Sequence, residues 1–230
     1  MNKKKLNVEE KYKAIFEKLV SDYADIKVKD KNNNESLLMD RGLLCIREIC
    51  KNAIVFVGIN PSNRIADKEN GFYKKGINFY DLNKWEQASF YEKFKEIYDD
   101  SQAANKLIEW TYIDMLYYRE TNQKYFKVLY ANHENFINEQ LAITKEIIEE
   151  IQPKMLVVCN TEARDQLKKM YDFEFDEEIG THRIIPNNKT KLNAIPVFFT
   201  SMLSGQRALD NGSFERLMWH IKYALDKVYK

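Results

Sequence analysis

The sequence predicts an α/β protein, a three-layer α/β/α sandwich with a central four-stranded parallel sheet. Short apolar runs rich in β-branched residues are typical of buried strands, and they occur at residues 53–59, 110–117, 154–160 and 195–202. Between these runs, apolar residues recur at the spacing of amphipathic helices. Strands that alternate with helices favour a parallel sheet that is covered on both faces.

Composition indicates one globular domain with additions. The chain has 230 residues, 44% of them hydrophobic, and a net charge of +1, so it is long enough to bury a full core. Balanced charge gives no overall attraction to DNA or a membrane, although a local basic patch stays compatible with nucleic-acid binding. Cys45, Cys50 and Cys159 lack C-x-x-C spacing and are predicted to be buried reduced thiols. No run is long enough to span a bilayer, so we expect a cytoplasmic protein that does not bind membranes.

Residues 1–50 are predicted to form a helical N-terminal extension, followed by the α/β domain of residues 51–230. Apolar residues spaced by three and four predict an amphipathic helix over residues 8–26. The charged, Asn-rich residues 27–35 are expected to form a loop. Residues 37–50 are expected to form a second helix that leads into the first strand.

The elements after the first strand follow the same reasoning. Residues 64–81 contain Gly71 and Gly76 and are expected to be an irregular loop. Helices are predicted at residues 82–98, 103–109, 135–151, 162–171 and 213–228. Thr161 and Ser213 are the expected N-caps of the last two helices.

The first predicted strand ends in a polar loop, Gly58-Ile59-Asn60-Pro61. Ligands of α/β proteins bind just outside the carboxyl ends of the strands, which is where Asn60 is expected to lie. Pro61 lacks an N–H and has a fixed φ, so it would stiffen the turn. The alternative role for Asn60 is an Asx-turn that only satisfies its own loop.

Four segments in order resemble the uracil-DNA glycosylase superfamily, and within it most closely the mismatch-specific uracil/thymine-DNA glycosylase branch. They are Gly58-Ile59-Asn60-Pro61 after strand one, Arg119-Glu120-Thr121 after strand two, Gln152-Pro153 before strand three and Met202-Leu203-Ser204-Gly205 after strand four. Leu203 replaces the proline of the family's last motif, and Ser62 replaces a glycine. The resemblance covers about residues 53–228 and leaves the first fifty residues without a counterpart.

This resemblance implies a monofunctional DNA glycosylase of base excision repair that works as a monomer without a metal or an organic cofactor. Such an enzyme hydrolyses the N-glycosidic bond of uracil or another altered base that is flipped out of DNA. Asn60 would be the catalytic residue. Its amide does not titrate, but its carbonyl oxygen could orient a water for a dissociative reaction in which positioning dominates.

The resemblance also suggests which residues would bind the base. Gly58, Ile59 and Pro61 would line the base site beside Asn60. Phe72 lies twelve residues after Asn60 and would stack on the flipped base, with Tyr73 as its neighbouring alternative. The other interpretation of this aromatic pair is packing on the sheet edge.

The segment after strand four would contribute both to base binding and to DNA binding. Met202 would lie near the base oxygen. Because methionine donates no hydrogen bond, the N–H groups of Ser204 and Gly205 would stabilise the leaving base or bind a phosphate. Gln206 or Arg207 would enter the duplex, and Lys74 and Lys75 would contact phosphate. A plain strand-to-helix turn is the alternative interpretation.

Asp114 departs from the family, which often has asparagine there to read the base edge. An ionised Asp114 would repel the O2 and O4 carbonyls of uracil and would suit an amino group. Alternatively, Asp114 faces a helix and contacts no ligand. This departure keeps open a second hypothesis, a module on the same fold that binds a nucleobase, nucleotide or nucleic-acid end without cleavage.

A third hypothesis, a nucleotide-binding enzyme of another class, lacks support from a G-x-G-x-x-G or Walker loop. His133, His182 and His220 are too dispersed in the sequence to suggest a metal site.

Overall fold

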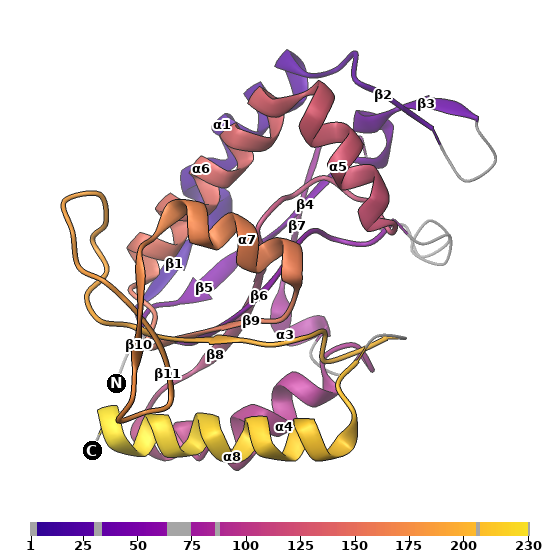
Figure 1. Ribbon diagram of the computed structural model, residues 1–230. Helices are drawn as coiled ribbons and strands as arrows, with labels where there is room; N and C mark the ends of the chain where they lie inside the picture. Colours follow the sequence, from indigo (N-terminus) through magenta and orange to yellow (C-terminus); the bar gives the residue numbers. More distant parts are fainter. Residues whose placement is uncertain (1–3, 30–33, 64–74, 86–87, 206–207, 230) are drawn as a thin grey trace.

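The computed structural model describes residues 4–29, 34–63, 75–85, 88–205 and 208–229. At its centre is a six-stranded mixed sheet in the order β10-β11-β12-β9-β6-β8 (Figure 1). Its strands in chain order are β6 (Ile54–Gly58), β8 (Trp110–Asp114), β9 (Met155–Val158), β10 (Phe173–Asp176), β11 (Thr181–Ile184) and β12 (Pro196–Phe199). The strand β6, which leads to the Asn60 loop, is hydrogen-bonded on both sides.

The mixed α/β class is confirmed, but the predicted four-stranded parallel sheet is not what the structure contains. All four predicted strands are present, and β12, β9, β6 and β8 pair in parallel. The antiparallel strands β10 and β11 extend this sheet to six strands and make it mixed. Their short, half-exposed sequences, such as Phe173–Asp176, do not form the continuous apolar run that marks a buried strand.

Helices cover both faces of the sheet (Figure 1). Val55 and Val57 of β6 belong to a core cluster with α1 (Val8–Asp22), α6 (Glu134–Ile151) and α7 (Thr161–Met170). Ile54 and Phe56 point to the other face, where they share a cluster with α4 (Glu92–Asp100) and α8 (Asn211–Val228). Successive side chains of β6 point to opposite faces of the sheet, so this one strand contributes to both apolar clusters.

The predicted helix over residues 37–50 is wrong. This segment contains the end of β3 (Glu35–Leu37), the 3-10 helix η1 (Leu38–Arg41), β4 (Leu43–Ile46) and β5 (Glu48–Cys50). Gly42, with φ of 69°, separates η1 from β4. The partners are distant in sequence, because β4 pairs with β7 (Ile77–Tyr80) and β5 pairs with β1 (Lys5–Asn7).

Other expectations are corrected in detail. The first helix is confirmed as α1. The expected loop at 27–35 contains β2 (Lys27–Lys29), which pairs with β3, and β7 lies within the expected irregular stretch 64–81. The helix expected at 82–98 is two helices, α3 (Leu82–Trp85) and α4. The segment 103–109 holds only the short 3-10 helix η2 (Ala103–Lys106), and α5 (Gln123–Asn132) was not predicted.

The two predicted N-caps are also wrong. Asn160 caps α7, because its side-chain oxygen accepts the N–H groups of Glu162 and Ala163. Asp210 caps α8 by accepting the N–H of Ser213. In both cases the capping residue precedes the predicted one in the sequence, and its amide or carboxylate oxygen accepts a main-chain N–H of the first helical turn.

None of the three cysteines forms a disulfide bond; Cys45 and Cys159 are buried as predicted, whereas Cys50 is partly exposed. Within the described part of the chain, no helix combines the length and the apolar character needed to cross a membrane.

Candidate functional site

A cavity of about 370 Å³ lies at the carboxyl ends of β6 and β8. Segments at the ends of four strands contribute to its wall: 58–62 at the end of β6, 119–121 after β8, 159–160 after β9 and 202–204 after β12. The cavity therefore brings together seven of the residues that the sequence analysis singled out: Gly58, Ile59, Asn60, Pro61, Asp114, Met202 and Ser204. Parallel strands place their carboxyl ends along one edge of a sheet, which explains why segments so far apart in sequence meet here.

Asn60 is held in one orientation by two main-chain carbonyl groups. Its side-chain NH₂ donates to the oxygen of Glu120 at 2.7 Å and to the oxygen of Pro61 at 3.0 Å. Carbonyl oxygens only accept hydrogen bonds, so the nitrogen must face them and the assignment of the amide is fixed. No group of the described residues donates to the amide oxygen, which is left for another donor.

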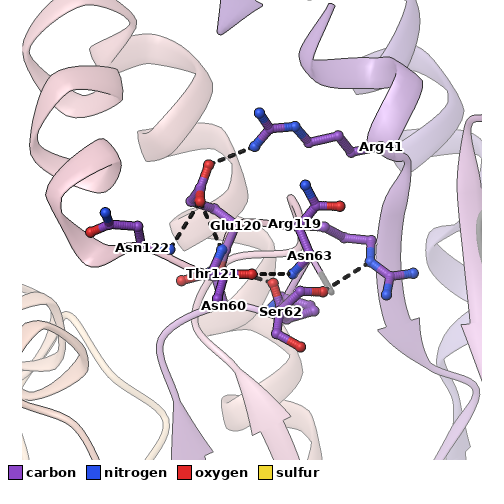
Figure 2. Close-up of polar contacts among 9 residues, drawn as sticks. Arg41, Asn60, Ser62, Asn63, Arg119, Glu120, Thr121 and Asn122 are labelled. Atoms are coloured by element: carbon purple, nitrogen blue, oxygen red, sulfur yellow. Dashed lines mark hydrogen bonds and ion pairs between the residues drawn. The ribbon is translucent and has the colours of Figure 1, made fainter. Parts of the chain in front are cut away.

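The loop around Asn60 is fastened to the loop around Glu120 by further contacts (Figure 2). The N–H of Glu120 donates to the carbonyl of Pro61 at 2.9 Å. Thr121 Oγ1 accepts the N–H of Asn63 at 3.0 Å, and Arg119 Nε donates to the carbonyl of Ser62 at 3.2 Å. The two loops therefore form one hydrogen-bonded unit.

Glu120 is the centre of this unit, and the sequence analysis did not single out its side chain. Its Oε1 accepts the N–H groups of Thr121 and Asn122 at 2.8 and 2.9 Å. Its Oε2 lies 2.5 Å from Nη1 of Arg41, with only 9% of the Arg41 side chain and 8% of the Glu120 side chain exposed. Arg41 comes from η1, so residues before the predicted domain boundary reach the site (Figure 2).

Asp114 forms the end of β8 and lines the cavity, so it does not face the helices away from the site. Its Oδ1 accepts the hydroxyl of Tyr112 at 2.9 Å. Burial raises the pKa of Asp114 to about 7, although the hydrogen bond from Tyr112 acts in the opposite direction. The carboxyl group of Asp114 therefore titrates near neutral pH, rather than being fully ionised there as the sequence suggested.

Gly58 is required by this arrangement. A Cβ added at Gly58 would lie 1.9 Å from Tyr112 Oη and 2.6 Å from Asp114 Oδ1. No heavy atom is accommodated at such distances, so only glycine lets β8 bring these two side chains against the main chain of β6.

An aromatic wall encloses the cavity, and the sequence analysis missed it. The lining aromatic residues are Tyr80, Phe90, Tyr91, Phe94 and Tyr112. Phe90 packs edge-to-face on Tyr91 and Tyr112, with ring centroids 4.8 and 5.5 Å apart, and is itself partly exposed. The apolar spacing of the helix predicted at residues 82–98 places Phe90 and Tyr91 on its inner side, but it does not indicate that they line a cavity.

Three residues of the segment after β12, Met202, Leu203 and Ser204, line the cavity. Met202 and Ser204 are partly exposed, whereas Leu203 is buried. Gly205 has a φ of 83° and is not part of the lining. The N–H of Leu209 donates to the carbonyl of Met202 at 3.0 Å.

Several predicted residues lie away from the cavity or outside the described residues. Lys75 is exposed and forms an ion pair with Asp40 at 2.6 Å. Phe72, Tyr73, Lys74, Gln206 and Arg207 are outside the described residues. Among the residues that are described, no three His, Cys, Asp or Glu side chains gather as metal ligands.

Comparison with known proteins assigns no family. No protein-family model matches the chain, and no curated protein matches it at a significant level. The interpretation of the cavity therefore depends on its own geometry and on the resemblance of the four sequence segments.

Proposed function

We propose that this protein is a DNA glycosylase that hydrolyses the N-glycosidic bond of uracil or another altered base. The observation that carries the proposal is the fixed amide of Asn60 at the wall of the cavity, with both N–H groups engaged and its oxygen left to accept a hydrogen bond. An oriented neutral acceptor of this kind suits a reaction in which a water has to be positioned rather than deprotonated.

The size and the walls of the cavity support a nucleobase as the ligand. A volume of about 370 Å³ falls within the range of small-molecule sites. Phe90 and Tyr91 supply aromatic surface on which a planar base could stack, and Asp114 supplies a polar group for its edge. A base can enter such a pocket only when it is flipped out of the helix.

In the proposed reaction, the Asn60 carbonyl oxygen accepts a hydrogen bond from a water and directs it at the anomeric carbon. The bond between this carbon and the base nitrogen breaks, and the base leaves with the electron pair. Water then adds to the oxocarbenium-like sugar, and the proton that it loses is transferred through solvent to the departed base anion, which gives the neutral free base and an abasic site. Main-chain N–H groups near Ser204 would stabilise the negative charge of the leaving base.

Two cavity residues favour a second candidate function, a binding module for a nucleobase, a nucleotide or a nucleic-acid end. Met202 donates no hydrogen bond to a leaving group, and Asp114 opposes the carbonyl groups of uracil whenever it is ionised. Both residues permit binding of a base without requiring its release.

The decisive experiment uses oligonucleotides that carry uracil, hypoxanthine, xanthine or a mismatch, followed by alkaline cleavage of abasic sites. We expect the wild-type protein to release at least one base. Asn60→Ala should lower the single-turnover rate by about a hundredfold, with DNA affinity nearly unchanged because phosphate contacts supply most of it. Asn105→Ala, at an exposed asparagine of η2, is the matched control and should leave the rate unchanged.

No release of any of these bases by the wild-type protein would contradict the glycosylase proposal. Fluorescence anisotropy with the same oligonucleotides would then test the binding module. Asn60→Ala with wild-type activity would remove Asn60 from the catalytic role.

A further inference from the structure

The contacts around Glu120 link the active-site amide to the N-terminal part of the chain. Glu120 uses its main chain toward Asn60 and Pro61, and its side chain toward Arg41. We propose that Arg41 and Glu120 are a positioning pair that holds Asn60 in its catalytic orientation; this role rests on the proposed function. The N-terminal segment would then be part of the catalytic machinery rather than an extension.

The position of Glu120 explains how the pair would act. The carbonyl oxygen of Glu120 forms the shorter of the two hydrogen bonds to the Asn60 amide, at 2.7 Å against 3.0 Å. Its own carboxylate accepts the next two main-chain N–H groups, which fixes the turn that aims this carbonyl. A shift of the Glu120 backbone would therefore move the Asn60 amide directly.

Arg41 holds the other oxygen of the same carboxylate. Arg41 Nη1 lies 2.5 Å from Glu120 Oε2, and less than a tenth of either side chain is exposed. A surface ion pair would be mobile and screened by salt, whereas a buried one has a defined geometry and leaves a costly unpaired charge if one partner is removed. Arg41 is thus suited to fix the Glu120 side chain in one rotamer.

The segment that carries Arg41 is itself anchored to the site. Gly42 follows Arg41, and the N–H groups of the next two residues, Leu43 and Leu44, donate to the carbonyls of Gly76 and Tyr117 at 2.8 and 2.9 Å. Leu44 also lines the cavity. Tyr117 lies between β8 and the Glu120 loop, so both ends of the Arg41–Glu120 contact are attached to the same part of the fold.

Kinetics test the pair in four variants. Arg41→Met and Glu120→Gln should each lower the single-turnover rate on the preferred base by about tenfold or more, with the dissociation constant for DNA within about twofold. The double variant should lose less than the product of the two single losses, because each single change leaves the other partner unsatisfied. Arg41→Lys should fall between the wild type and Arg41→Met, since it keeps the charge but not the planar group.

Arg164→Met is the matched control, because Arg164 pairs with Asp165 on the exposed surface of α7. It should leave the rate and the affinity within about twofold of the wild type. If the double variant instead loses as much activity as the product of the two single losses, the coupling between Arg41 and Glu120 would be overturned.

A second measurement follows Asn60 itself and does not need catalysis. The side-chain NH₂ resonances of Asn60 are assigned by their absence in Asn60→Ala, and their exchange with water is measured by NMR. Exchange should be slow in the wild-type protein and about tenfold faster in Arg41→Met and in Glu120→Gln. A folded variant with wild-type exchange would overturn the proposal, whether or not its rate had fallen. If no base is released by the wild-type protein, the proposed function fails, but the exchange result still decides the positioning role.

Discussion

At the scale of single residues, Asn60 differs from an aspartate by one atom: its side chain ends in an oxygen and a nitrogen, whereas an aspartate has two oxygens. In the structure the side-chain nitrogen of Asn60 donates to two main-chain carbonyl oxygens. An aspartate would place a carboxylate oxygen 2.7 and 3.0 Å from the same two acceptors. Opposed acceptors left unpaired in a buried site cost about 1–3 kcal/mol.

We therefore expect Asn60→Asp to be slower than the wild type at pH 7, by about tenfold or more, although a carboxylate is the stronger base. The protonated carboxyl group regains one donor, so the activity of this variant should rise as the pH falls. Single-turnover rates between pH 5 and pH 8 check this. A variant that is faster than the wild type at pH 7 would contradict the assigned orientation of the amide.

Asp114 is the residue whose chemistry changes most between sequence and structure. From the sequence it is an ionised acceptor, but burial raises its pKa to about 7. A protonated Asp114 donates a hydrogen bond to a carbonyl group, and an ionised Asp114 accepts one from an N–H group. The same side chain would thus favour different bases on the two sides of neutrality.

If a base binds against Asp114, preference for uracil over bases that present an N–H edge should fall as the pH rises through about 7. The change should be roughly ten- to hundredfold, as expected when a buried polar group loses its partner. In Asp114→Asn, the amide offers both a donor and an acceptor and does not titrate. At high pH the preference should therefore shift toward uracil relative to the wild type, and it should not change with pH. Competition between two oligonucleotides at pH 6 and pH 8 measures the ratio; equal ratios in the wild type would exclude this role.

The raised pKa also makes a prediction about stability that does not depend on function. A carboxyl group whose pKa is higher in the folded state binds more protons there, so stability falls as the pH rises from about 4 to about 7. Asp114→Asn lacks this loss and should be more stable than the wild type at pH 8 by about 2 kcal/mol, since solvent in the cavity weakens the full effect. The difference should vanish near pH 4. Urea unfolding at both pH values checks it, and a constant difference would contradict the raised pKa.

At the scale of elements, the fit between β6 and β8 depends on the missing side chain of Gly58. Gly58→Ala should cost about 1–3 kcal/mol of stability, because Tyr112 and Asp114 must both move away from the new Cβ. Adding Tyr112→Phe removes the hydroxyl that lies closest, and should restore part of the loss. Gly212→Ala in the first turn of α8 is the control, since its Cβ would meet Asp210 at an ordinary 3.4 Å. Chemical denaturation of the four proteins measures these changes, and an unchanged Gly58→Ala would contradict the packing.

Elements were predictable where the apolar pattern alone determines the structure. The run at residues 53–59 becomes β6, and the amphipathic pattern at residues 135–151 becomes most of α6, because burial decides both. The segment at residues 37–50 was misassigned because β4 and β5 depend on partners elsewhere in the chain. Short apolar runs of this kind are equally compatible with a helix until their pairing is known.

The site was predictable to a similar extent. Asn60, Asp114 and Ser204 follow strands, so their shared position was implied by the parallel order of the sheet. The Arg41–Glu120 contact joins residues 79 positions apart, and neither residue carries a local signal for it. Phe90 had an inward-facing pattern, but which cavity it faces is decided by the packing of α4 on the sheet.

At the scale of the whole molecule, the residues before 51 share a core with the rest of the chain. Tyr12, Phe16 and Leu43 are completely buried and belong to the same apolar cluster as Val55 and Ile147. The rings of Phe16 and Tyr117 pack edge-to-face, with centroids 4.6 Å apart. This face of the sheet is therefore covered partly by the segment that the sequence suggested was an extension.

A chain of residues 51–230 tests whether the boundary predicted at residue 51 separates an independent domain. Without α1 and β4, the apolar groups that contact Tyr12, Phe16 and Leu43 would face water, and this loss exceeds the few kcal/mol by which most domains are stable. We expect an expanded state that keeps helical far-UV circular dichroism, loses the near-UV signal of its buried aromatic residues and binds a hydrophobic dye. The separate peptide of residues 1–50, added to the truncated chain, should restore part of the near-UV signal, because it brings back the missing face of the core. Cooperative unfolding of residues 51–230 alone, with a native near-UV spectrum, would instead show that the α/β domain folds without its N-terminal segment.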